Sequence, residues 1–191
     1  MWGFIGFVPW IVYAVIATSD EWRWGAIAGL AIAVVLVVVH KARRRTWDTM
    51  VIETSAVVFF ALMTAYSLIQ PDSPVTAYGP ALVDVWLGLT AWGSLAIRKP
   101  FTLPIAKTMA PEEVWHLPLF YRMNAIITGV WAASFTVAAV ALGLVLFLNP
   151  HATGLVIGIK VATFVIPVIF TIRYPQAVRA RAEREQPVVN G

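Results

Sequence analysis

The feature of this sequence that most constrains its fold is a series of six apolar stretches, each about as long as a bilayer-crossing helix. The hydrocarbon core of a bilayer is ~30 Å thick, and a helix rising ~1.5 Å per residue needs ~20 residues to cross it. Because these stretches are continuously apolar rather than alternating in polarity, they predict an all-α, polytopic transmembrane bundle. They lie near residues 2–18, 22–40, 49–69, 81–97, 124–148 and 154–172.

The predicted spans form one transmembrane helical domain over residues 1–172, followed by a basic tail over residues 173–191. Pro9 and the short first stretch leave two arrangements open: six spans, or five if that stretch is re-entrant. Charged residues make up 13% of the chain, whereas a soluble domain carries about 25%. We therefore expect any function to lie in the membrane or in short loops.

Lysine and arginine are distributed unevenly, which predicts the orientation of the bundle. Twelve of the fourteen fall in three segments that alternate with the spans, whereas the opposite connections carry only Arg23. Because cytoplasmic loops are enriched in these residues, the sequence predicts that the three segments, including the C-terminus, are cytoplasmic. The twelve residues are Lys41, Arg43, Arg44, Arg45, Arg98, Lys99, Lys107, Arg122, Arg173, Arg179, Arg181 and Arg184.

Three ionisable side chains, those of Glu53, Asp84 and Lys160, lie inside apolar stretches. A charge at the bilayer centre costs about 2.5–3.5 kcal/mol on insertion scales, so each needs a partner or a route to the interface. Asp84 precedes Arg98 by 14 residues, and Lys160 precedes Arg173 by 13. With both arginines at the cytoplasmic boundary, the acid and the amine lie ~20 Å above it on helices that run in the same direction. The sequence therefore predicts an Asp84–Lys160 ion pair.

The two arginines that mark depth belong to a repeated pattern, Ile97-Arg98-Lys99-Pro100 and Ile172-Arg173-Tyr174-Pro175. Proline has no N–H to donate within a helix and clashes with the preceding turn. We therefore expect both helices to end at these prolines, and we expect Arg98, Lys99 and Pro100 to form a basic cytoplasmic turn.

Two interpretations of the Asp84–Lys160 pair remain open. In the first, the pair is structural and sets the orientation and register of two helices, or the two side chains extend separately toward the interface. In the second, the pair is functional, as a proton or ion relay or as a site for an anionic headgroup. Few other polar residues occur in the spans to line a transport path, which favours the structural interpretation.

Glu53 lies about one turn inside its apolar stretch, close in sequence to Arg43, Arg44 and Arg45. We expect an ionised, interfacial carboxylate that extends toward these arginines or accepts a hydrogen bond near Thr49 or Thr54. A catalytic role would require a partner acid, and Asp84 is predicted near the opposite face of the membrane.

The connection over residues 98–123 is basic at its edges and apolar within. Pro111, followed by two glutamates, is typical of a helix start, and Pro118 is expected to interrupt that helix. Such a segment is either an ordinary surface loop or a segment in the headgroup layer, where lysine and arginine bind anionic lipid. The tail is expected to be a solvated or membrane-skimming helix, with no indication of nucleic-acid binding.

No sequence motif indicates an enzyme or a bound cofactor. The chain has no cysteine, and the three histidines fall at a helix end or in loops, at different predicted depths. The spacings of zinc proteases, nucleophile elbows, P-loops and dinucleotide sites do not occur. We therefore expect no catalytic residue, no metal and no cofactor.

Small residues recur at four-residue spacing at Gly25 and Gly29 and again at Gly154 and Gly158. Such spacing lets two helix backbones approach closely. We expect packing within the chain at both motifs, with dimerisation as the alternative.

Several of these features, taken in order along the chain, resemble the intracellular septation protein A family of bacterial inner-membrane proteins. The likeness rests on Phe7-Val8-Pro9, the basic cluster after the second span, Arg98-Lys99-Pro100, Asn124 at the start of the fifth span, and Lys160. The resemblance implies a polytopic inner-membrane protein linked to cell-envelope biogenesis and septation through division or cell-wall proteins. It also implies that the Arg98-Lys99-Pro100 turn, Asn124 and Lys160 are important.

The composition and the absence of catalytic motifs predict a non-enzymatic multi-pass membrane protein, and the resemblance implies that it supports cell-envelope biogenesis and septation in the inner membrane. Its expected partners are membrane lipids, including anionic headgroups, and membrane proteins of the division or cell-wall machinery. The alternative is a small transporter or lipid-handling protein that uses Asp84 and Lys160.

Overall fold

The structure is a computed structural model, and it describes residues 2–17 and 22–185. Within these residues it is entirely helical, as predicted, with seven α-helices and four short 3-10 helices. The 3-10 helices are η1 (Trp2–Phe7), η2 (Trp47–Met50), η3 (Pro74–Tyr78) and η4 (Glu112–Val114). The α-helices are α1 (Val8–Ile16), α2 (Trp22–Ala42), α3 (Val51–Ile69), α4 (Gly79–Ala96), α5 (Thr102–Lys107), α6 (Pro118–Leu148) and α7 (Thr153–Glu185).

Four of the helices are long and apolar enough to cross a bilayer. They are α2, α3, α6 and the part of α7 that ends at Arg181. The N-terminal segment Ile5–Ile16 is apolar but shorter, and α4 has 18 residues that include Asp84. The described chain therefore has the helices of a multi-pass membrane protein.

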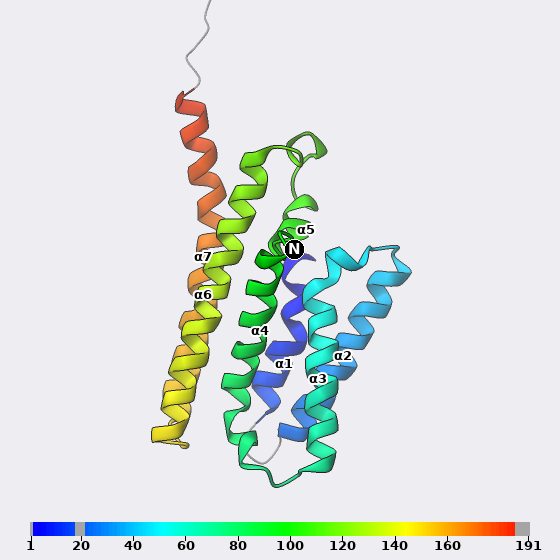
Figure 1. The fold of residues 1–191 in the computed structure, drawn as a ribbon, viewed down its shortest axis with the longest axis vertical. Coiled ribbons are helices and arrows are strands. Elements are labelled where there is room, and N and C mark those ends of the chain that lie inside the picture. The colour runs from blue at the N-terminus through cyan, green and yellow to red at the C-terminus, as the bar shows by residue number, and fades with distance from the viewer. Residues whose placement is uncertain (1, 18–21, 186–191) are drawn as a thin grey trace, which may run out of the picture.

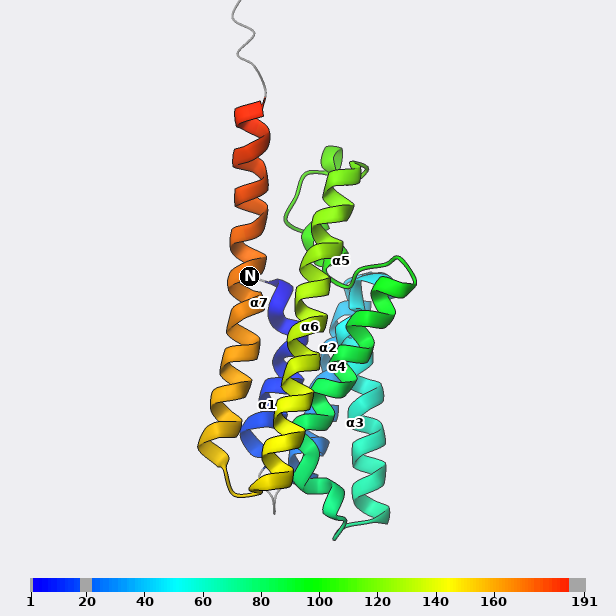
Figure 2. The same ribbon diagram turned by 60° about the vertical axis from the view of Figure 1, so that its left-hand side comes forward.

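The helices run alternately up and down, so the basic segments gather at one end of the bundle. The turn after α2, the α4–α6 connection and the C-terminal part of α7 all lie at the upper end in Figure 1. The α3–α4 and α6–α7 connections lie at the opposite end (Figures 1 and 2). We call the upper end in Figure 1 the basic end, and it comprises residues 43–50, 97–117 and 173–185. Ten of the twelve predicted cytoplasmic Lys and Arg residues lie in it, and the other two, Lys41 and Arg122, lie close to it in the sequence.

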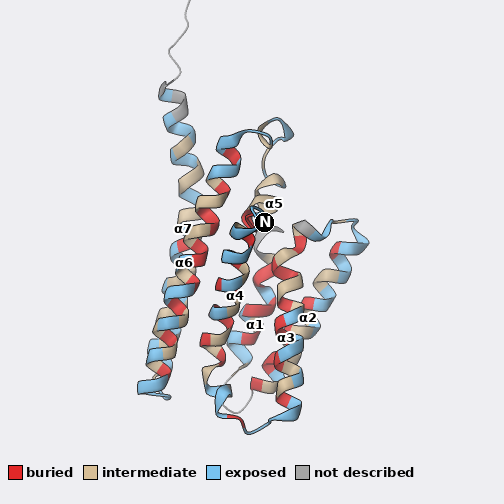
Figure 3. Ribbon diagram, viewed as in Figure 1, coloured by how far each residue is buried: buried red, intermediate tan, exposed pale blue. Residues whose placement is uncertain are grey.

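The N-terminal segment packs one of its faces against helices α3 and α6. Phe7, Trp10 and Tyr13 are buried, as the red segments of α1 in Figure 3 illustrate. The Trp10 ring lies 5.0 Å from the ring of Phe60 on α3, and the Phe7 ring stacks 5.3 Å from Trp131 on α6. The segment runs from the basic end toward the start of α2 (Figure 1), and its other face, with Ile11, Val15 and Ile16, is exposed.

The last helix does not end where the sequence predicts. We expected Pro175 to end it, but α7 continues through Pro167 and Pro175 to Glu185. Each proline removes one backbone hydrogen bond, the one that its own N–H would donate to the carbonyl four residues earlier. Two missing bonds in a helix of 33 residues leave enough intact turns on either side for the helix to continue.

Pro111 and Pro118 also differ from expectation. Pro111 precedes η4, which is a single 3-10 turn of three residues rather than a short α-helix. Pro118 does not interrupt a helix but begins α6, because a proline at the first helical position lacks only an N–H that would have no partner there. Asn124 therefore lies inside α6 rather than at its start.

The two small-residue motifs have different surroundings. A Cβ placed on Gly29 would lie 2.9 Å from the Phe60 ring, and one on Gly25 would lie 2.9 Å from the Cβ of Ala17. The first motif therefore packs within the chain, as predicted. Among the described residues, no atom outside the local helix backbone lies within 4 Å of such a Cβ on Gly154 or Gly158, so the same prediction is wrong for the second motif.

Candidate functional site: an intramembrane ion pair and the basic end

Asp84 and Lys160 are in direct contact, at the level that the depth argument predicts. Lys160 Nζ lies 2.6 Å from Asp84 Oδ2 and also donates to the Pro80 carbonyl at 2.8 Å. The Asp84 side chain is 6% exposed and that of Lys160 is 25% exposed. The Lys160 ammonium group thus donates two hydrogen bonds to α4, and the Asp84 carboxylate is buried.

The contact occurs because α4 and α7 run in the same direction on either side of the antiparallel helix α6. Both α4 and α7 pack on α6, which places their residues of equal depth near each other (Figure 2). The long lysine stem then spans the remaining distance to α4. The pair therefore connects two helices whose main packing partner is a third.

The Glu53 carboxylate does not extend toward the surface as the sequence predicts. It is buried beneath the N-terminal segment, with His40 Nδ1 3.3 Å from its Oε1. The contact is an ion pair when the imidazole carries a proton. Gly6 makes this cover possible, since a Cβ at that position would lie 3.1 Å from Glu53 Cδ.

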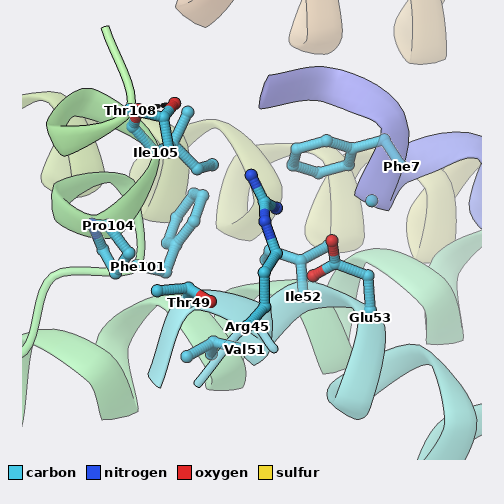
Figure 4. A pocket seen from close by; sticks show the side chains of 11 residues that line it. Phe7, Arg45, Thr49, Val51, Ile52, Glu53, Phe101, Pro104, Ile105 and Thr108 are labelled. Carbon is cyan, nitrogen blue, oxygen red and sulfur yellow. Dashed lines mark hydrogen bonds between the residues drawn. The ribbon is translucent and has the colours of Figure 1, made fainter. Parts of the chain in front are cut away.

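The nearby arginines do not all lie where we expected them relative to Glu53. Arg45 lines the same small cavity as Glu53, together with Phe7 and Thr49 (Figure 4). Arg44 is exposed and has a φ angle of 58°. Glu53 therefore lies against α2 and the N-terminal segment, and it does not extend to solvent. His40 is the neighbour that sequence reasoning missed, since nothing in the sequence places it opposite Glu53.

The Arg98-Lys99-Pro100 turn ends α4 with a specific backbone pattern. Lys99 N–H donates to the Ser94 carbonyl at 2.8 Å, and Arg98 N–H donates to the Leu95 carbonyl at 2.9 Å. This pattern requires a left-handed residue, usually glycine, and Arg98 takes that position with a φ of 57°. Both arginine and lysine are exposed, whereas Pro100 is buried.

The turn after α2 repeats this arrangement. Arg45 N–H donates to the His40 carbonyl at 3.1 Å, and Arg44 N–H donates to the Lys41 carbonyl at 2.9 Å. Two helices thus end at the same end of the bundle on a left-handed arginine. An L-residue in this conformation costs about 1 kcal/mol, so glycine would be the better residue for stability alone. The two left-handed arginines therefore add positive charge at the basic end and lower the folding stability slightly relative to glycine.

Asn124 belongs to a buried hydrogen-bond network that joins α5 to α6. The side-chain Nδ2 of Asn124 donates to the Phe120 carbonyl at 2.8 Å, and the backbone carbonyl of Asn124 accepts from Thr102 Oγ1 at 3.0 Å. Thr102 Oγ1 also lies 2.8 Å from Thr128 Oγ1. Thr102 and Thr128 were not singled out from the sequence, because α5 is only six residues long and its docking on α6 depends on the fold.

Comparison of the chain with protein-family models, curated proteins and solved structures returned no match. The resemblance to the septation protein A family therefore remains a prediction. What the geometry establishes is an all-helical protein with four helices able to cross a membrane, a buried acid–amine contact between two of its helices, and basic turns at one end.

Proposed function

We propose that this protein is a multi-pass protein of the bacterial inner membrane that supports cell-envelope assembly and septation through contacts with membrane proteins and lipids. One observation carries the membrane part of the proposal. Large apolar side chains remain exposed around the outside of the bundle, whereas arginine and lysine collect at one end. Examples from four helices are Val35, Leu62, Val137 and Ile166.

We propose six crossings, with the basic end in the cytoplasm. The N-terminal segment and α4 are shorter or less apolar than the other four helices, but both run between the two ends of the bundle. Each of the two also presents apolar side chains on an outer face, Ile11 and Val15 on the N-terminal segment and Val85 and Leu89 on α4, as a helix in contact with lipid requires. Asp84 is compatible with a crossing because Lys160 compensates its charge.

A cysteine-accessibility experiment tests this topology. The experiment needs no prior removal of cysteines, because the sequence contains none. Single cysteines replace Arg44, Arg98, Asp72 and His151, four exposed positions. In intact spheroplasts, a membrane-impermeant maleimide is expected to label the cysteines at 72 and 151, and to label those at 44 and 98 only after lysis. Labelling of 44 and 98 from opposite sides would contradict the proposed topology.

The envelope role is tested by crosslinking in cells. The tagged protein, expressed at native level, is expected to crosslink to membrane proteins of division or cell-wall synthesis. Mass spectrometry should find these at least fivefold enriched over a multi-pass control protein of equal abundance. Depletion of the protein should also produce elongated or detergent-sensitive cells. Enrichment no greater than in the control, together with normal cells after depletion, would exclude the proposed role.

The structure favours a structural role for the Asp84–Lys160 pair over the transport alternative. Each group has its partner in the other, and the lysine has a further acceptor in Pro80. Two cavities lie at the basic end, and neither is lined by Asp84 or Lys160. This arrangement supports a scaffold in which the pair holds α7 against the rest of the bundle.

A further inference from the structure

The larger of the two cavities lies between α5, α6 and α7 at the basic end. Its volume is about 330 Å³, which is within the range of small-molecule sites. Its existence depends on α5, a short helix that folds back beside α6 and is held there by the Thr102–Asn124 hydrogen bond. The cavity is therefore bounded by a short helix, a spanning helix and a helix with two internal prolines.

The inner part of the cavity is apolar and has an aromatic floor. Phe7 and Trp131 line it and stack on each other with ring centroids 5.3 Å apart. Trp131 Nε1 donates to Thr171 Oγ1 at 3.0 Å, which joins α6 to α7 at this level. Ile105 and Met109 of α5 line the cavity from the other side. This chemistry suits a hydrocarbon chain.

The outer part of the cavity is marked by a positive charge. Among the described residues that line it, Arg179 is the one that carries a charge, and its side chain is exposed. Arg179 follows Thr171 by eight residues on α7, so the lining extends ~12 Å along the helix. The cavity is thus elongated along α7, with its apolar and charged parts at different depths.

The depths of the apolar and charged parts correspond to those of the acyl chains and the headgroup of a bilayer lipid. With Arg173 at the cytoplasmic edge of the hydrocarbon core, Arg179 lies ~9 Å beyond it, in the headgroup layer. Thr171 and Trp131 lie on the hydrocarbon side of the same edge. The polar side chains that line the inner part, those of Thr102, Asn124 and Thr171, already hydrogen-bond within the protein, so they offer little to the polar atoms of a peptide or a soluble metabolite. An amphiphile matches both parts.

We propose that this cavity binds one acyl chain of an anionic phospholipid, with the lipid phosphate at Arg179. The arginine guanidinium can donate two parallel hydrogen bonds to phosphate oxygens, and the surrounding basic end attracts anionic lipid. The inference rests on the proposed membrane placement of the protein, and it adds a specific lipid site that this placement alone does not require.

Native mass spectrometry of the full-length protein tests the charged part of the site. The protein is released from nanodiscs of equal parts phosphatidylglycerol and phosphatidylcholine with identical acyl chains. We expect one retained phosphatidylglycerol and at least fivefold less phosphatidylcholine. Arg179→Gln should abolish this preference, whereas Arg181→Gln, an exposed arginine on the same helix that does not line the cavity, should keep it. Equal loss in both variants would overturn the assignment of the phosphate to Arg179.

A second pair of variants tests the apolar part. Ala106→Phe fills the cavity from α5, whereas Ala133→Phe adds the same side chain at an exposed position of α6. We expect at least fivefold less retained lipid for Ala106→Phe and wild-type retention for Ala133→Phe. Wild-type retention in Ala106→Phe would overturn the proposal. Failure of the protein to insert into nanodiscs at all would contradict the membrane placement instead, so the two failures are distinguishable.

Discussion

Lys160→Met is expected to lower the free energy of unfolding by about 3–5 kcal/mol, the range for removing one partner of a buried ion pair. The substitution keeps most of the apolar stem but removes the ammonium group that lies 2.6 Å from Asp84 Oδ2. The carboxylate is then left 6% exposed with its charge uncompensated, and the contact between α4 and α7 loses its polar component. Reversible unfolding in mixed detergent micelles, followed by tryptophan fluorescence, measures the change.

The double variant Asp84→Leu with Lys160→Met is the control for this prediction. Both charges are then absent, so the double variant should regain most of the lost stability, because an apolar pair of similar volume is often neutral or stabilising. A double variant as unstable as Lys160→Met would contradict the explanation by an unpaired charge. A stable double variant that no longer supports growth of depleted cells would instead favour the functional interpretation of the pair.

Trp131→Ala is expected to cost about 3 kcal/mol of unfolding free energy, the lower end of the range for removing a buried aromatic side chain. Trp131 is 1% exposed, and its ring lies within 6 Å of those of Phe7, Phe135 and Phe164. The lower end applies because lipid is as apolar as the core, so the loss comes mainly from packing. The same unfolding measurement in micelles checks it.

Trp92→Ala is the matched control, because Trp92 is 48% exposed on the outside of α4. Its loss removes one hydrogen bond, from Nε1 to Thr136 Oγ1 at 3.1 Å, so we expect a change of about 1 kcal/mol or less. Equal effects of the two substitutions would contradict a core centred on Trp131. Both tryptophans lie inside apolar stretches, and only the fold distinguishes their surroundings.

The positions of the long helices were predictable because hydropathy and helix length are local properties. Predicted spans such as 22–40 and 49–69 differ by only a few residues from α2 and α3. The Asp84–Lys160 contact was predictable for a related reason. The rise per residue of a helix sets the depth of a side chain, so two opposite charges at equal depth on helices of the same direction can be matched from residue counts.

Errors arose where a local rule competed with neighbouring structure. Pro175 removes one hydrogen bond, but the turns on either side of it maintain α7. Glu53 is close to three arginines in sequence, yet the N-terminal segment covers it and places His40 beside it. In both cases the sequence rule describes the residue alone, and contacts from other parts of the chain decide the outcome.

Helical structure, repeated apolar stretches of membrane-crossing length and basic residues that alternate between them could all be predicted, because they depend only on composition and spacing along one segment. Three features depend on tertiary contacts: the packing of the N-terminal segment on α3 and α6, the hydrogen bond from Thr102 to the Asn124 backbone carbonyl, and the cavity between α5, α6 and α7 that Arg179 lines. Such contacts join residues far apart in the chain, and their distances are set by how side chains pack rather than by the order in which they occur.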